Sequence, residues 1–446
     1  MPSRANRSIS RSPLGRLLGY AQARLTRLHR AALLSMLTGA GIDAATAAAG
    51  IMLARGLGPD GRGTFAALWL LPRVLTPLAT LGMGDASTYF FSRDRMLGRR
   101  LFNQAFVLSP FMGLLSAALA LPFLGLYLRQ YNASVTQLAI VIMCIALPTG
   151  IWNDSLTAML RGCKAYGAMN AIRILQPVSE LIVIAGLYFS GNLTVLTLSI
   201  EHILTAGVLC PAVQCWFLRQ SVKFRPALSW PVLRQTFAFG LKTQSGVLAQ
   251  VASNRLSWVL LVTMLPPAGL GLYVVATTAA EALMLFPQAF SLILLPEVAS
   301  RSKADGVHLT NRVFRLNGAI LLVAASGLIV LMPFLVGLIY GPAFLGAVAP
   351  ARILAAGVVC YGLTTMLGES LKGLNRPLYT TIAYAAGTCI TLALLVALTG
   401  PLGLVGAAVA TSCGYLASLI ATHILLRLAS APERPLEAGL VLEVSA

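Results

Sequence analysis

Charged residues are scarce in this chain. Only 11% of its 446 residues are Asp, Glu, Lys or Arg, whereas 57% are hydrophobic. Soluble domains carry about 25% charged residues, so this composition excludes an ordinary soluble domain. Apolar stretches recur from Ala31 onward, and each is long enough to cross a hydrocarbon core of about 30 Å as a helix. Because these stretches do not alternate with polar residues at a period of two, they exclude a transmembrane barrel. The sequence predicts an all-α, polytopic membrane protein.

Metal-binding and disulfide patterns are also lacking. The seven cysteines are scattered without a C-x-x-C pair, and the four histidines do not cluster near them. Scattered cysteines inside apolar runs are typical of small packing residues. We therefore predict no metal site, no cofactor and no catalytic residue.

Interruptions by Gly, Pro and charge divide the apolar sequence into about twelve predicted transmembrane helices. The first six are expected near residues 31–55, 63–91, 102–128, 136–160, 171–190 and 193–218. The second six are expected near residues 235–264, 268–298, 315–340, 347–371, 377–399 and 402–427.

The basic residues test this topology. With a cytoplasmic N-terminus, 26 of the 33 Lys and Arg residues fall in inner segments, and both termini are cytoplasmic. Three fall in outer loops, namely Arg55, Arg62 and Arg129. Four lie within spans, namely Arg73, Lys242, Arg255 and Arg352. This bias follows the positive-inside rule, so the net charge of +19 does not require a nucleic-acid partner. Residues 1–30 hold seven arginines and no acid, which fits either an amphipathic helix on anionic membrane lipids or a disordered leader.

A short Gly/Pro stretch occurs twice, 208 residues apart. Gly58-Pro59, Gly61 and Gly63 correspond to Pro266-Pro267, Gly269 and Gly271. At the same offset "SRDR" meets "SRSK", and further on "MLRGCKAYG" resembles "SLKGLNRPLY". The chain is therefore predicted to hold two parallel six-helix lobes, each with this stretch as the tight outer turn between its first two helices. The expected segments are a basic N-terminal segment (1–30), an N-lobe (31–220), a cytoplasmic linker (221–234), a C-lobe (235–428) and a cytoplasmic tail (429–446).

A family resemblance rests on these same residues. "LARGLGPDGRGTFAALW" followed by "LATLGMGDASTYFFSRD" resembles the start of oligosaccharide-lipid flippases within the multidrug/oligosaccharidyl-lipid/polysaccharide exporter superfamily. The resemblance implies two lobes that alternate between inward-open and outward-open forms in the bacterial inner membrane. It implies as cargo an undecaprenyl-pyrophosphate-linked oligosaccharide moved to the periplasmic leaflet for polysaccharide biosynthesis, and it leaves room for polymerase or export partners.

Ionisable residues within spans are the candidate functional groups, since each costs about 3 kcal/mol at the bilayer centre unless it meets a cavity or a partner. In the resembling family the first two helices of each lobe line a central cavity. The cations on those helices are therefore the predicted cargo site, namely Arg73, Arg255 and Lys242. The acids on the same helices are the predicted counter-charges, namely Asp43, Asp85 and Glu281. Arginine forks bind phosphate oxygens bidentately, which suits a pyrophosphate head. Asp154, Glu180 and Glu201 are instead expected to form hydrogen-bonded pairs within one lobe.

Two other functions stay open on sequence grounds. A cation-coupled drug exporter of the same superfamily would carry a net-acidic, aromatic-lined cavity, against which the three basic residues argue. A membrane-embedded glycosyltransferase or polymerase would place acidic and His/Arg clusters in a large outer loop, whereas every predicted outer loop is short. The sequence leaves sugar identity, energy coupling and oligomeric state undetermined.

Overall fold

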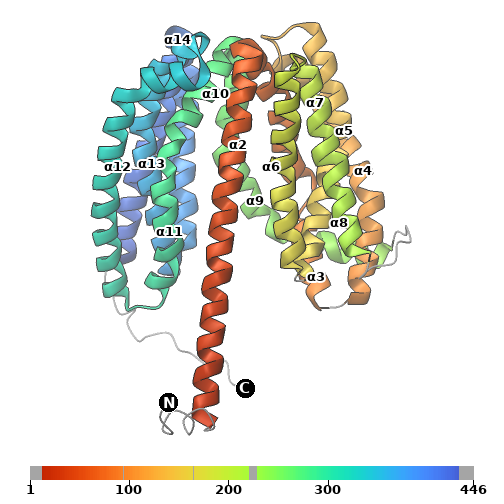
Figure 1. Cartoon of the computed structure of the whole chain (residues 1–446), viewed down its shortest axis with the longest axis vertical. Coiled ribbons are helices and arrows are strands. Elements are labelled where there is room, and N and C mark those ends of the chain that lie inside the picture. Colours follow the sequence, from red (N-terminus) through yellow and green to blue (C-terminus); the bar gives the residue numbers. More distant parts are fainter. Residues whose placement is uncertain (1–12, 94, 164, 220–228, 431–446) are drawn as a thin grey trace, which may run out of the picture.

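The computed structural model describes residues 13–93, 95–163, 165–219 and 229–430. Within those ranges, the side chains of 13–38, 40, 43, 92–99, 166, 242–254 and 292–293 also lie outside the description. The described chain is helical throughout and forms two bundles that stand side by side, with helix α2 between them (Figure 1). This confirms the predicted all-α membrane fold.

The first bundle contains the helices predicted for the N-lobe. They are α2 (Pro13–Ala79), α3 (Met83–Arg93), α4 (Arg95–Tyr127), α5 (Ala133–Gly162), α6 (Tyr166–Phe189), α7 (Val195–Leu204), the π-helical turn η1 (Thr205–Leu209) and α8 (Cys210–Leu218). Helix α2 holds two predicted spans, which meet at a non-helical residue, Gly58, with φ 66°. Only glycine adopts this backbone angle readily, so the break falls there.

The second bundle follows the same order. It contains α10 (Pro267–Glu281), η2 (Ala282–Met284), α11 (Leu285–Ala299), α12 (Lys303–Tyr340), η3 (Pro342–Ala347), α13 (Val348–Gly373) and α14 (Pro377–Ser430). Helix α14 again holds two predicted spans, which meet at Gly403 with φ 54°. Eight helices in the described chain are long and apolar enough to span a membrane, or nine if one bent pair counts as a span. The count of twelve stays a prediction.

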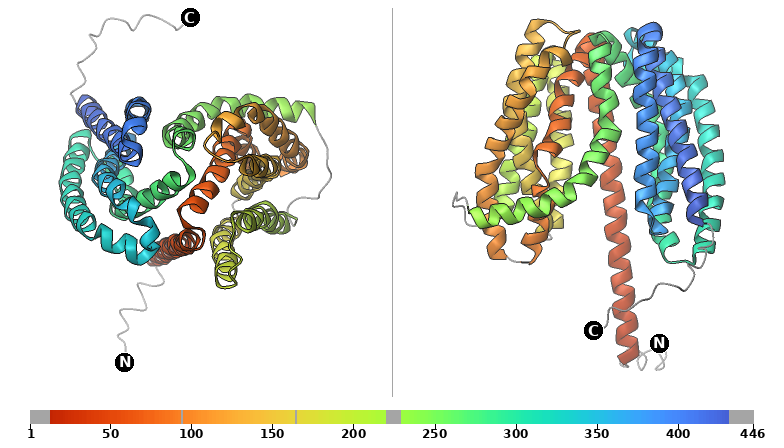
Figure 2. Two further views of the ribbon diagram at one scale, coloured as in Figure 1. Left: turned by 90° about the horizontal axis from the view of Figure 1, so that it is seen from above. Right: turned by 180° about the vertical axis from the view of Figure 1, so that it is seen from behind.

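Helix α9 (Trp230–Met264) joins the two bundles. Its first part crosses beneath the first bundle before the helix rises toward the second (Figure 2). Phe239 stacks on Tyr89 of α3 with ring centroids 4.7 Å apart. Gly240 packs so closely on Gly82 that a Cβ at Gly82 would lie 2.2 Å from the Gly240 carbonyl oxygen. The helix begins five residues before the predicted lobe boundary at 235, so part of the predicted linker is helical.

The repeated Gly/Pro stretches pack against each other. A Cβ at Gly63 would lie 1.8 Å from the Pro267 carbonyl oxygen, and a Cβ at Gly271 would lie 1.9 Å from the Pro59 carbonyl oxygen. The two contacts are equivalent under the repeat: Gly63 corresponds to Gly271, and Pro267 corresponds to Pro59, at the offset of 208 residues. Such reciprocity is the property of a twofold interface. The repeat therefore serves a structural need, because only glycine lets these two backbones approach so closely where the lobes meet.

Two arginines strengthen this end of the molecule, which we call the turn end. Arg55 of α2 donates from Nε to the carbonyl of Ile339 at 2.7 Å, and also donates to the carbonyl of Leu338. Arg129, between α4 and α5, donates from Nε to the carbonyl of Thr263 at 2.7 Å. All three acceptors lie in the last turn of a helix, two in α12 and one in α9, where carbonyls lack helical partners and cations are favoured. The two lobes are thus clasped at the turn end.

A charged cavity between the two lobes

A cavity of about 370 Å³ lies between the lobes. Its walls come from α2, α6 and α7 on one side and from α9 and α10 on the other. Charged, aromatic and hydroxyl side chains line it together (Thr46, Arg62, Phe65, Trp69, Arg73, Glu180, Glu201, His202, Arg255, Trp258, Thr277, Thr278 and Glu281). Most of a membrane protein's ionisable side chains avoid the apolar interior, so this gathering marks the cavity as the candidate site.

The second half of α2 contributes one wall of the cavity. Arg62, Ala66, Trp69 and Arg73 line the cavity and recur three or four residues apart, which places them on one face of the helix. The helix resumes at Pro59 directly after the break at Gly58, so Arg62 lies in its first turn. Two guanidinium groups, three turns apart, therefore project from the same face.

The guanidinium groups in this cavity lie near carboxylates, since Arg73 interacts electrostatically with Glu180 and Arg255 with Glu281. Within the described part of the chain, none of Arg62, Arg73 and Arg255 forms a salt bridge. The Nε of Arg62 and the indole Nε1 of Trp69 are buried, and neither finds a hydrogen-bond acceptor among the described residues. Buried donors without partners are costly, and an acceptor-rich ligand removes that cost.

Two of the three cavity carboxylates are engaged inside the N-lobe. Glu180 lies 3.2 Å from Nδ1 of His202 and accepts from the Gln176 amide at 3.2 Å. Glu201 accepts from the Thr205 hydroxyl at 2.8 Å, at the start of the π-helical turn η1. These contacts confirm the hydrogen-bonded pairs expected for Glu180 and Glu201, whereas Asp154 forms no hydrogen bond or salt bridge among the described residues. Neither carboxylate forms a salt bridge with an arginine of the cavity among the described residues.

The third carboxylate occupies a position equivalent to an arginine. Glu281 is the last residue of α10, and it corresponds to Arg73 at the offset of 208. Trp69 and Leu70 correspond in the same way to Thr277 and Thr278, and all four line the cavity. The two lobes thus contribute matching helix faces, but the N-lobe face is basic where the C-lobe face is acidic.

The structure brings together three of the six predicted site residues. Arg73, Arg255 and Glu281 lie on the cavity wall. Asp85 lies exposed in the first turn of α3, where an acid suits the helix N-terminus, and is not among the lining residues. The side chains of Asp43 and Lys242 lie outside the described residues, so their roles stay predictions.

Sequence reasoning missed several lining residues. Arg62 was assigned to an outer loop, although its spacing of eleven residues from Arg73 equals three helical turns and would have put both on one face. His202 stacks edge-on against Trp69 with ring centroids 4.2 Å apart. No local pattern links α7 to α2, so the sequence carried no signal for that contact.

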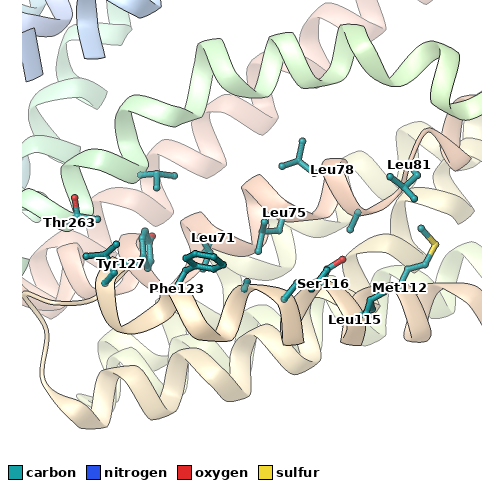
Figure 3. Close-up of a pocket in the computed structure, with 15 residues that line it drawn as sticks. Leu71, Leu75, Leu78, Leu81, Met112, Leu115, Ser116, Phe123, Tyr127 and Thr263 are labelled. Atoms are coloured by element: carbon teal, nitrogen blue, oxygen red, sulfur yellow. The ribbon is translucent and has the colours of Figure 1, made fainter. Parts of the chain in front are cut away.

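An apolar groove of about 640 Å³ lies on the other side of α2. Leu71, Leu75 and Leu78 of α2 face Met112 and Phe123 of α4 across it (Figure 3). These leucines lie on the helix face opposite Arg62 and Arg73. One helix therefore presents a charged face to the cavity and an apolar face to the groove.

Two solved structures share this architecture. The inward-facing conformation of a multidrug resistance MATE family transporter of the MOP superfamily matches with a TM-score of 0.69 and 15% identity, over 86% of this chain and 93% of that one. The lipid II flippase MurJ, in an inward closed conformation, matches with a TM-score of 0.72 and 13% identity, over 89% and 87%. At 15% and 13% identity these matches show a shared fold of two helical lobes.

The family follows from the sequence match. Residues 52–349 match the family described as "Polysaccharide biosynthesis protein", and the chain belongs to that family. A curated relative, the probable low-salt glycan biosynthesis flippase Agl15 of Haloferax volcanii, is 26% identical over 200 residues. That match covers 43% of this chain and 42% of the relative, which is less than half of each. The chain is thus a member of a polysaccharide biosynthesis family and has the fold of the two transporters above.

Proposed function

We propose that this protein moves an undecaprenyl-pyrophosphate-linked oligosaccharide from the inner to the outer leaflet of the bacterial inner membrane by alternating access. The observation that carries the proposal is the set of three guanidinium groups in the central cavity, none of them salt-bridged among the described residues. Guanidinium is always charged and matches phosphate oxygens in a bidentate geometry.

The energetics favour such a site. A bare pyrophosphate crossing hydrocarbon faces a cost of the order of tens of kcal/mol, which a wet basic cavity removes. A membrane potential that is negative inside also favours outward movement, by about 4–5 kcal/mol for two charges at ~100 mV. The cargo is amphiphilic, and α2 offers a charged face and an apolar face on its two sides.

The contacts at the turn end support an inward-facing arrangement. The lobes touch there through Gly63 and Gly271, and the arginine clasp closes the same end. The loops at the opposite end carry basic residues such as Arg301, Lys303 and Arg376, which suits the cytoplasmic side with both termini. Outward opening then requires the turn end to separate, after which the cargo is delivered to polymerase or export machinery.

A deletion strain of the native host tests the proposal. Without the protein, lipid-linked oligosaccharide accumulates in the inner leaflet, and the wild-type gene restores export. We expect Arg73→Ala and Arg255→Ala to insert normally and fail to restore export. Arg352→Ala is the matched control, because Arg352 is exposed, donates to the carbonyl of Ile329 at 3.0 Å and lies outside the cavity lining. Full export by the Arg73/Arg255 double variant would overturn the cargo role of the cavity.

A further inference from the structure

A second cavity lies inside the C-lobe and shares part of its lining with the first. It has a volume of about 240 Å³ and is lined by α9, α10, α13 and both halves of α14. Four residues line both cavities, namely Arg255, Trp258, Thr277 and Glu281. A ligand whose charged group rests at Arg255 can therefore extend into the C-lobe without leaving the protein. We call this space the tyrosine cavity.

Aromatic rings from different helices gather in the tyrosine cavity. Tyr361 of α13 stacks on Tyr415 in the second half of α14, with ring centroids 4.7 Å apart and planes 27° apart. Tyr384, in the first half of α14, lies 6.4 Å from Tyr361. Trp258 packs edge-on against Tyr273 at 5.4 Å. Apolar ring surfaces with polar edges suit a ligand that has both kinds of surface.

The tyrosine cavity holds two kinds of hydroxyl group: threonine oxygens that can accept a hydrogen bond, and phenol groups without a hydrogen-bond partner among the described residues. Thr277 and Thr391 donate to carbonyls of the preceding turn, at 2.8 and 3.0 Å, so their oxygen lone pairs remain available to accept. The hydroxyls of Tyr361, Tyr384 and Tyr415 make no hydrogen bond within the described chain. The Tyr273 hydroxyl is already shared with Thr411 at 2.8 Å.

The charge in this cavity is confined to its mouth. Among the described residues that line it, only Arg255 and Glu281 are Arg, Lys, Asp, Glu or His, and both also line the central cavity. No group of three or more His, Cys, Asp or Glu that could hold a metal ion occurs in the described part of the chain. A neutral ligand with many hydroxyls therefore fits the interior better than a cation does. At about 30 Å³ per water the cavity has room for roughly eight waters, which matches one sugar ring better than a chain of them.

We propose that the tyrosine cavity is a carbohydrate subsite that holds the first sugar of the cargo while its pyrophosphate rests on the arginines of the central cavity. A pyranose ring has C–H groups on its faces and hydroxyls around its rim. The faces pack on the rings of Tyr361 and Tyr415, and the hydroxyls pair with phenol and threonine oxygens. The inference rests on the proposed function, because it assumes the pyrophosphate site.

Binding of defined lipids to the purified full-length protein tests this subsite. The probes are farnesyl pyrophosphate and its glucose-, galactose- and N-acetylglucosamine-bearing derivatives. We expect at least one sugar-bearing probe to bind more tightly than farnesyl pyrophosphate. Tyr361→Leu and Tyr415→Leu should then remove that gain, a loss of roughly tenfold, and leave farnesyl pyrophosphate binding unchanged. Tyr188→Leu is the control, since Tyr188 lies in α6 of the other lobe and is not among the residues that line the tyrosine cavity.

The outcomes separate the two proposals. If the wild type binds farnesyl pyrophosphate and Arg255→Gln does not, the result supports the pyrophosphate site. If the wild type itself does not bind farnesyl pyrophosphate, the pyrophosphate site is overturned. Equal affinity of the wild type for all four probes overturns the sugar subsite alone. Binding of ²²Na⁺ that is lost in Tyr361→Leu, without any preference for sugar-bearing probes, would assign the tyrosine cavity to a cation. Tyr361→Phe, which keeps the ring, should retain most of the gain and thereby show that the protein still folds.

Discussion

The reciprocal glycine contact at the turn end makes a sharp prediction. In Gly271→Ala the new Cβ would lie 1.9 Å from the Pro59 carbonyl oxygen, whereas ordinary contact begins at 3.4 Å. The obstacle is backbone on both sides, so the helices must separate by about 1.5 Å at this point. Overpacking of this kind costs about 1–3 kcal/mol. The cost applies only while the lobes touch, so the equilibrium should shift toward an open turn end by roughly 5- to 150-fold.

Distances between spin labels measure this shift. Labels on unnatural amino acids at Asn192 and Ala343 avoid the seven native cysteines and sit at exposed positions, one on each lobe. The distance distribution should gain a longer component in Gly271→Ala. Gly400→Ala is the matched control, because nothing lies within 4 Å of a Cβ there. An unchanged distribution in folded Gly271→Ala protein would refute the idea that this contact holds the lobes together.

Further predictions concern the cavity, the clasp and the C-lobe. Arg62→Gln should weaken farnesyl pyrophosphate binding by about tenfold or more, since a charge-assisted contact is lost; equal affinity would remove Arg62 from the site. Arg129→Gln loses the hydrogen bond to the Thr263 carbonyl, so the population of the long-distance component in the same spin-label measurement should rise roughly two- to fivefold. An unchanged population would show that this bond does not hold the lobes together. In Gly387→Ala a Cβ would meet the Ser418 hydroxyl at 1.8 Å. Thermal unfolding should show a loss of about 1–3 kcal/mol, and an unchanged midpoint would contradict the close packing within α14.

Much of the fold could be predicted because its signals are local or repeated. Apolar runs and positively charged loops locate the helices, and most of each predicted span is helical. The span predicted at 63–91 is wrong in one respect, because it is broken at residues 80–82, where α2 ends and α3 begins at a bend of 50°. The offset between Gly63 and Gly271 indicated two equivalent halves. The physical reason for the repeat, a backbone contact between those two glycines, became visible only in three dimensions.

The site was less predictable because its partners come from distant helices. Arg73, Arg255 and Glu281 could be selected as costly charges within spans. The pairing of Glu180 with His202, and the engagement of Glu201 by Thr205, depend on how helices α6 and α7 meet. The charge balance of the cavity therefore could not be read from residue counts, since some of its acids are already engaged.

The opposite signs at Arg73 and Glu281 have a consequence for transport. Two helix faces related by the repeat but unlike in charge create a local electric field between them, directed from Arg73 toward Glu281. A passenger with one anionic end and one neutral end acquires a preferred heading in that field. A lipid must still turn over between the leaflets, so an anionic end that is held in one place becomes the point about which the rest of the molecule turns.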